Sequence, residues 1–144
     1  TVGYREYAIQ ESAYNSFLAR MSQSEADKNS IRPGHSEHQT GLAVNVAATY
    51  ETSVAFSETE TYKWMVENCT SYGFIQRYAN EKSSITGVKD ELEHFRYVGK
   101  DLAKKITESH LTYDEYYMLY LADWDEKSCI PSKKILKNIP DYVQ

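Results

Sequence analysis

Several features that define common protein classes are scarce or missing in this 144-residue sequence. No apolar stretch approaches the roughly 18 residues of a membrane-spanning helix, and no secretory signal is present. No basic run exceeds two residues and the net charge is −5, which argues against nucleic-acid binding. Gly-rich phosphate loops and nucleophilic-serine motifs are also missing, which disfavours nucleotide hydrolysis and serine-hydrolase chemistry.

Cysteine is limited to two positions, Cys69 and Cys129. They lie far apart in the sequence and lack the spacing of paired metal ligands, so a cysteine-based zinc site is not expected. Cys69 falls on the apolar side of an expected helix, which favours a buried free thiol. A disulfide between the two cysteines is the alternative.

Two segments contain most of the candidate catalytic and metal-binding side chains. Residues 36–45 read SEHQTGLAVN, and residues 91–99 read ELEHFRYVG. Together they supply two imidazoles, His38 and His94, an amide oxygen at Asn45, and a carboxylate three residues before the second imidazole. Three ligands, an open position for water and a nearby base are the components of a mononuclear zinc hydrolase.

The order of these motifs resembles that of a known family. Ser-x-His-x-x-Gly-x-Ala-x-(Asp), followed by Glu-x-x-His-(Phe/Tyr)-Arg-Tyr-Val-Gly, is similar to VanY-type D-alanyl-D-alanine carboxypeptidases and their LD-carboxypeptidase relatives. The resemblance runs from residue 3 to about residue 117 and includes segments 72–78 and 85–87. Members of this family are zinc enzymes that trim the stem peptides of peptidoglycan.

The resemblance implies a role for seven side chains. These are the Zn²⁺ ligands His38, Asn45 and His94, the catalytic base Glu91, and the substrate contacts Arg5, Gln10 and Ser36. It also implies a stem peptide ending in D-alanine as the partner and an extracellular or bacterial cell-surface location. Because the first residues already lie inside a motif, we expect an export signal or anchor to precede this chain, and membrane contact only through it. We expect a monomer.

Asn45 is the main departure from the family pattern, which has a zinc-binding Asp at this position. An amide oxygen can coordinate a divalent cation, but it lacks the negative charge of a carboxylate, so zinc affinity should fall. A tolerated natural variant, an introduced inactivating substitution and a natural pseudoenzyme all remain open. Two functions follow: a zinc carboxypeptidase, or a catalytically impaired or inactive module that binds cell-wall peptides. Leu92 and Glu93 also differ from the family pattern, which has Pro or Asp and then Trp.

Some of the implied roles have simpler alternatives. Arg5 could form a surface ion pair with Glu6 or Glu11 instead of gripping a substrate carboxylate with its guanidinium fork. The hydroxyl of Ser36 could cap the turn that carries the first imidazole. Glu93 competes for the base role, but on a strand it points away from its neighbour His94, so Glu91 is favoured.

The expected fold is α+β, with a small, mostly antiparallel sheet that carries the zinc site and helices packed on its other face. Hydrophobic patterning and capping signals define the elements. Strands are expected at 1–5, 42–48, 74–78 and 94–98. Helices are expected at 6–21, at 57–71 with a Ser57/Glu60 capping box, at 101–109 and from Thr112, with 79–87 as a loop and Glu91 in a turn. Residues 1–124 would form the catalytic domain and 125–144 a C-terminal tail.

Overall fold

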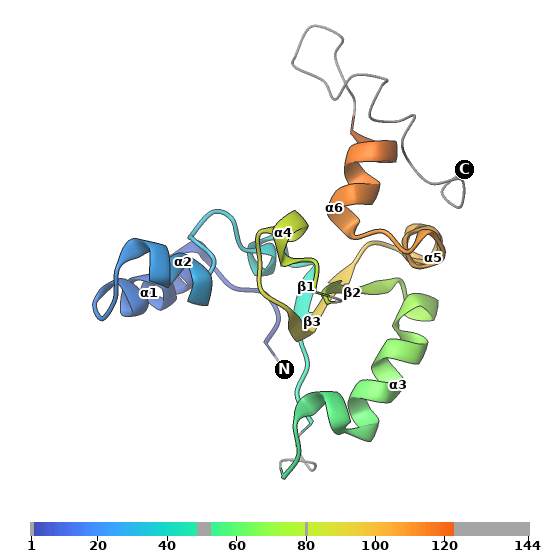
Figure 1. Cartoon of the computed structure of the whole chain (residues 1–144), viewed down its shortest axis with the longest axis horizontal. Coiled ribbons are helices and arrows are strands. Elements are labelled where there is room, and N and C mark those ends of the chain that lie inside the picture. Colours follow the sequence, from blue (N-terminus) through green and yellow to red (C-terminus); the bar gives the residue numbers. More distant parts are fainter. Residues whose placement is uncertain (1, 49–52, 80, 123–144) are drawn as a thin grey trace, which may run out of the picture.

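The computed structural model describes residues 2–48, 53–79 and 81–122, and its centre is a three-stranded antiparallel sheet with the strand order β1-β3-β2 (Figure 1). The elements in chain order are α1 (Tyr7–Leu18), α2 (Gln23–Asn29), η1 (Glu37–Thr40), β1 (Ala43–Asn45), η2 (Phe56–Glu58), α3 (Glu60–Asn68), η3 (Cys69–Tyr72), β2 (Phe74–Tyr78), α4 (Ser83–Thr86), β3 (Glu91–Tyr97), α5 (Lys100–Ser109), α6 (Tyr113–Tyr116) and η4 (Tyr117–Leu121). The predicted α+β class is confirmed. The expected C-terminal tail, 125–144, lies outside the described residues.

The central strand β3 aligns the sheet. Asn45 of β1 lies directly opposite His94, and Ile75 of β2 lies opposite Arg96. Directly opposed residues of antiparallel strands share one face of the sheet. The register therefore places the two motif residues, Asn45 and His94, side by side.

The start of β3 corrects one expectation. Glu91 is the first residue of the strand and pairs with Tyr78, whereas the sequence placed it in the preceding turn. Gln76 and Tyr78 are two positions apart in β2, but their partners Phe95 and Glu91 are four positions apart in β3, so the pairing is irregular here. A bulge interrupts the strict alternation of side chains along a strand.

Other boundaries also differ from the sequence expectation: β1 covers 43–45 instead of 42–48, and α1 ends at Leu18 instead of residue 21. The first segment forms only an isolated bridge between Val2 and Asn45, not a strand. Helix α3 begins after Thr59, whose hydroxyl accepts a hydrogen bond from the Tyr62 backbone N–H, so the cap is not Ser57. Segment 79–87 contains the short helix α4 instead of an uninterrupted loop. The Thr112 capping box forms as predicted and starts α6.

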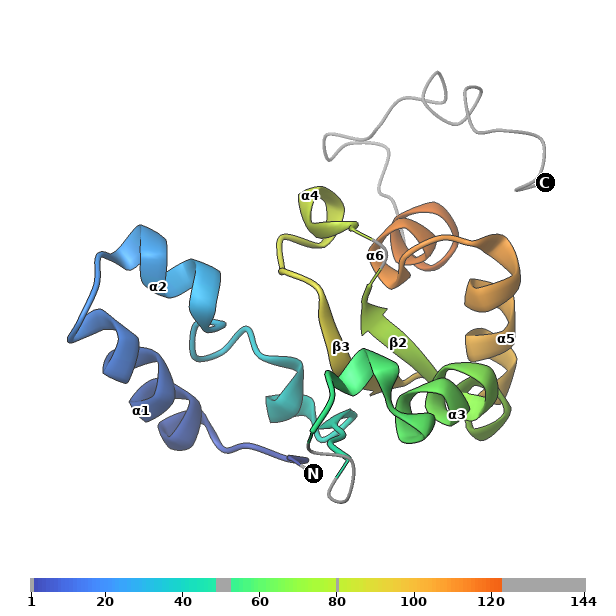
Figure 2. The same ribbon diagram turned by 60° about the horizontal axis from the view of Figure 1, so that its bottom comes forward.

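Helices lie against both faces of the sheet (Figure 2). On one face, Gln76 of β2 donates to the Tyr62 hydroxyl of α3, and Phe95 is fully buried. On the face that carries His94, Ile75 packs against Ala103 and Ile106 of α5. Apolar burial therefore stabilises the sheet from both sides, at roughly 25 cal/mol per Å² of apolar area removed from water.

A close backbone approach at Gly73 joins α3 to the sheet. Its φ of +88° is a conformation that side-chain-bearing residues rarely adopt. A Cβ there would lie 2.8 Å from the Tyr97 ring and 3.1 Å from the Gly99 carbonyl carbon. Glycine is therefore needed both to turn the chain and to let β2 begin beside the end of β3.

Helices α1 and α2 pack on each other and stand beside the sheet (Figures 1 and 2). The Tyr14 hydroxyl of α1 donates to Asp27 of α2 at 2.6 Å, and Arg32 forms an ion pair with the same carboxylate. Cys69 is buried and free, while Cys129 lies outside the described residues. Within 2–48, 53–79 and 81–122, no helix is long and apolar enough to span a membrane.

Candidate metal centre and active site

Three side chains from the two motifs meet at one point. His38 comes from η1, which ends at Gly41 with a left-handed φ of 72°, and the chain then enters β1 and reaches Asn45. The Asn45 Oδ1 atom lies 3.0 Å from His38 Nε2 and 2.9 Å from His94 Nδ1. The two imidazole rings approach edge to face, with centroids 5.0 Å apart. The residues predicted as zinc ligands are therefore brought together.

The outer nitrogens of the two imidazoles face hydrogen-bond acceptors. His38 Nδ1 lies 2.8 Å from the Gly3 carbonyl oxygen, and His94 Nε2 lies 3.2 Å from Glu37 Oε2. Each outer nitrogen must carry the proton that it donates, so the inner nitrogen of a neutral ring holds a lone pair. Metal-binding histidines are typically held in this way, by a carbonyl or carboxylate on the far nitrogen.

The protonation states agree with this arrangement. Burial lowers the pKa of His38, which favours the neutral ring. Burial alone would raise the pKa of Glu37, but the hydrogen bond from His94 and the charges of Arg77 and Arg96 lower it to about 2. Glu37 is thus a carboxylate at neutral pH and can accept the imidazole proton.

Three lone-pair atoms, two imidazole nitrogens and one amide oxygen, thus point at a common centre. Nitrogen and oxygen ligands of this kind suit Zn²⁺. Among the described residues, no group of three or more His, Cys, Asp or Glu side chains is arranged to hold a metal ion. Any metal here would therefore need the Asn45 oxygen as its third ligand, and the residues present fit that role.

Glu91 is the carboxylate closest to the inner side of this centre. Its Oε2 lies 3.6 Å from His94 Nδ1, and burial raises the pKa of Glu91. On a regular strand, side chains three positions apart point to opposite faces, so the irregular start of β3 is what allows Glu91 to contact His94. Glu93 is half-buried, and its backbone carbonyl accepts a hydrogen bond from Val46. Glu91 is thus the carboxylate in contact with the inner nitrogen of His94.

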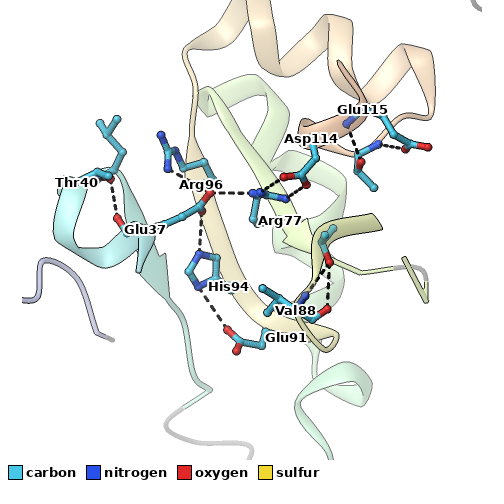
Figure 3. Close-up of polar contacts among 12 residues, drawn as sticks. Glu37, Thr40, Arg77, Val88, Glu91, His94, Arg96, Asp114 and Glu115 are labelled. Atoms are coloured by element: carbon cyan, nitrogen blue, oxygen red, sulfur yellow. Dashed lines mark hydrogen bonds and ion pairs between the residues drawn. The ribbon is translucent and has the colours of Figure 1, made fainter. Parts of the chain in front are cut away.

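Glu37 has a structural role that the sequence did not reveal. Its Oε1 accepts from Arg77 Nε at 2.9 Å and lies 3.2 Å from Arg96 Nη1, while Oε2 faces His94 (Figure 3). Arg77 in turn holds Asp114 through both of its terminal nitrogens, at 2.7 and 2.9 Å. The only sequence signal was a carboxylate directly before a candidate ligand, His38, yet in the fold it serves the other histidine.

The predicted substrate contacts lie on the N-terminal side of the centre. The Arg5 backbone N–H donates to the His38 carbonyl, and Arg5 Nη1 donates to Gln10 Oε1 at 2.7 Å. Gln10 is 1% exposed, and its Nε2 donates to the Ile31 carbonyl at 2.6 Å. Gln10 therefore supports Arg5 from within the protein. Ser36 is buried at the N-cap of η1, but its hydroxyl does not cap that helix.

A cleft of about 1150 Å³ leads away from Glu91. It is lined by residues of α2 and the loop after it, and by the segment from α4 to the start of β3. Its charged lining residues are Asp27, Lys28, Arg32, Lys89, Asp90 and Glu91. Most of its other lining residues are polar, and Glu91 links it to the residues around His94.

A profile of the D-alanyl-D-alanine carboxypeptidase family VanY matches residues 1–100. The chain belongs to the VanY family. It is 39% identical over 118 residues to the putative carboxypeptidase YodJ of Bacillus subtilis, a match that covers 80% of this chain and 43% of YodJ. It is 40% identical over 100 residues to a D-alanyl-D-alanine carboxypeptidase of Enterococcus faecalis, covering 69% of this chain and 36% of that protein. The chain thus spans less than half of these VanY-family relatives.

Solved structures of VanY-family and related enzymes have the same fold. The LD-carboxypeptidase LdcB superposes with a TM-score of 0.74 at 37% identity, covering 80% of this chain and 55% of LdcB. VanYB in complex with D-alanine-D-alanine has a TM-score of 0.70 at 36% identity, covering 82% of this chain and 68% of VanYB. A mutant of the D,D-pentapeptidase VanY in complex with Zn(II) has a TM-score of 0.67 at 36% identity, covering 79% and 67% of the two chains. The predicted family and fold are confirmed.

Proposed function

We propose that this chain is the catalytic domain of a zinc-dependent carboxypeptidase that removes the terminal D-alanine from peptidoglycan stem peptides. The observation that carries the proposal is the convergence of His38 Nε2, Asn45 Oδ1 and His94 Nδ1, with both outer imidazole nitrogens held by acceptors. The Zn(II) complex of a VanY neighbour supports the choice of metal. The domain would occupy 1–124 and act as a monomer outside the cell or at its surface.

Zinc held by these three side chains would polarise the scissile carbonyl and make a water molecule more acidic. Glu91 then acts as the general base, because its carboxylate lies beside the inner nitrogen of His94 and is partly shielded from solvent. The same carboxyl delivers the proton to the departing amine nitrogen, so that the released D-alanine leaves as a neutral or protonated amine. Burial raises the pKa of Glu91, which suits a group that must both take and return a proton.

The remaining residues would bind the peptide. The guanidinium of Arg5 is held by Gln10 beside the His38 backbone and would grip the terminal carboxylate of D-alanine. The rest of the stem peptide would run into the cleft that begins at Glu91. Ser36 would contact the peptide close to the cleaved bond. VanYB in complex with D-alanine-D-alanine supports this class of ligand.

A second function is favoured by Asn45 itself. The uncharged amide gives zinc a weaker site than a carboxylate would, so the chain could bind cell-wall peptides without cleaving them. Incubation of the zinc-supplemented protein with stem pentapeptide and tetrapeptide, followed by quantification of free D-alanine, separates the two functions. Release that is abolished by a chelator supports the enzyme. Peptide binding without release, at full zinc occupancy, supports the binding module and refutes the enzyme.

A further inference from the structure

Behind His94 lies a cluster of four charged side chains, of which the proposed function uses only the contact of Glu37 with His94. Glu37 comes from η1, Arg77 from β2, Arg96 from β3 and Asp114 from α6 (Figure 3). The side chains of Arg77 and Glu37 are only 6% and 12% exposed. Burying charged groups costs free energy, and ion pairs of this kind are often no more stabilising than apolar packing. Their arrangement toward one imidazole therefore calls for a functional explanation.

The guanidinium of Arg77 is divided between two carboxylates. Its Nε donates to Glu37 Oε1, while Nη1 and Nη2 donate to the two oxygens of Asp114. Asp114 therefore keeps both terminal nitrogens away from Glu37. As a result, Glu37 Oε2 stays free to accept the proton of His94 Nε2 at 3.2 Å.

The charges of the cluster balance only when Asp114 is included. Two guanidinium groups then face two carboxylates. Without Asp114, two cations would compete for the single carboxylate of Glu37. A bidentate grip by Arg77 on both Glu37 oxygens is the geometry that guanidinium groups prefer, and it would displace the His94 N–H from Oε2.

We propose that Asp114 is a positioning residue for His94, acting through Arg77 and Glu37. It lies beyond residue 100, where the VanY profile match ends, on a helix that the Thr112 capping box starts. The inference uses the proposed function only in treating His94 as a metal ligand. Helix α6 thereby orients the imidazole from outside the motifs that define the site.

The test observes the His94 ring directly, in the metal-free protein with a chelator present. In the unaltered chain, the Nε2–H proton should give a downfield ¹H–¹⁵N resonance that exchanges slowly with water, because a buried carboxylate accepts it. Asp114→Asn should speed the exchange of the His94 Nε2–H proton at least about tenfold, because a neutral side-chain amide cannot hold both terminal nitrogens of Arg77 as the carboxylate does. Asp114→Glu, which keeps the charge, should restore part of the protection.

Thr112→Ala is the matched control, because it weakens the cap of α6 without touching the cluster. If this control speeds the exchange as much as Asp114→Asn, general loosening of α6 explains the effect and the proposal is overturned. An unchanged His94 resonance in Asp114→Asn also overturns it.

Zinc affinity gives a second readout. Loss of a partner behind a metal-binding histidine typically weakens metal binding by about 10- to 100-fold. We expect that range for Asp114→Asn and a change of less than about threefold for Thr112→Ala. If the unaltered chain releases no D-alanine but Asp114→Asn still shifts the His94 resonance, the proposed function fails while the positioning role stands.

Discussion

Replacing Asn45 by Asp changes one atom type at the centre of the site and adds one negative charge. The side chains are nearly identical in shape, so one carboxylate oxygen would occupy the position of the present Oδ1, 3.0 Å from His38 Nε2 and 2.9 Å from His94 Nδ1. The substitution therefore isolates the effect of charge on metal binding. Restoring the family's carboxylate should tighten the binding of zinc.

The size of the effect follows from Coulomb's law. At a zinc–oxygen distance of ~2.1 Å, one added negative charge attracts a divalent cation by about 4 kcal/mol, even with the full screening of water. Burying the new carboxylate beside two buried imidazoles offsets part of this gain. We expect zinc to bind about 100- to 1000-fold more tightly, since about 1.4 kcal/mol corresponds to a factor of ten.

The assay is a competition titration against a chromogenic zinc chelator, with D-alanine release measured on the same samples. Asn15→Asp, an exposed substitution on α1, controls for the change in net charge. Equal zinc affinity in Asn45→Asp and the unaltered chain, within about threefold, would refute the ligand role of Asn45. Zinc binding and turnover only in Asn45→Asp would support the binding-module function for the unaltered chain. No turnover in either, despite bound zinc, would contradict both the substrate and the mechanism.

Three further predictions concern the base, the acid stability and the core. Glu91→Gln should lower turnover by about 10²- to 10⁴-fold while Glu93→Gln changes it only a few-fold, and the reverse result would reassign the base. The fold lowers the pKa of Glu37 from about 4.5 to about 2, which stabilises the folded state by an amount on the order of 3 kcal/mol. This stabilisation should be fully present above about pH 4.5 and should be lost as the pH falls toward 2. In urea unfolding with a chelator present, the stability difference between the unaltered chain and Glu37→Gln should therefore shrink over that range, and a constant difference would contradict it. Phe95→Ala should cost about 3–5 kcal/mol of unfolding free energy, against less than about 1 kcal/mol for exposed Ile9→Ala.

The family could be predicted because its motifs are short runs of neighbouring residues, and the meeting of the two motifs followed from the resemblance to that family. The 74–78 strand was predicted with its observed bounds, since this aromatic-rich segment, FIQRY, follows the helix-ending Gly73 and precedes a polar segment. His38 and Asn45 were placed together by a glycine-containing loop that leads into a strand. The fold class followed from the same alternation of short strands and capped helices.

What the sequence could not show depends on register and tertiary packing. Glu91 reaches His94 because the pairing of β3 with β2 is irregular between Phe95 and Glu91. Such an irregularity is not visible in the hydrophobic pattern of the sequence. Glu37 accepts a hydrogen bond from His94 and not from its neighbour His38, because of the position of η1 relative to the sheet. Gln10 was predicted as a substrate contact, yet its side chain is buried, where it donates to the Ile31 carbonyl and accepts from Arg5.

The brevity of β1 has a consequence for how the centre opens. This strand contains only three residues, and the last of them is Asn45, held to β3 by bonds such as Val46 N–H to the Glu93 carbonyl. On its other side, Asn45 is held among the described residues only by the isolated bridge to Val2, and segments with few contacts open locally at a lower free energy than global unfolding. Fraying of β1 would carry Asn45 away from His94 while the α5 side of the sheet stays folded. Metal loading should therefore slow amide hydrogen exchange most strongly at residues 43–46.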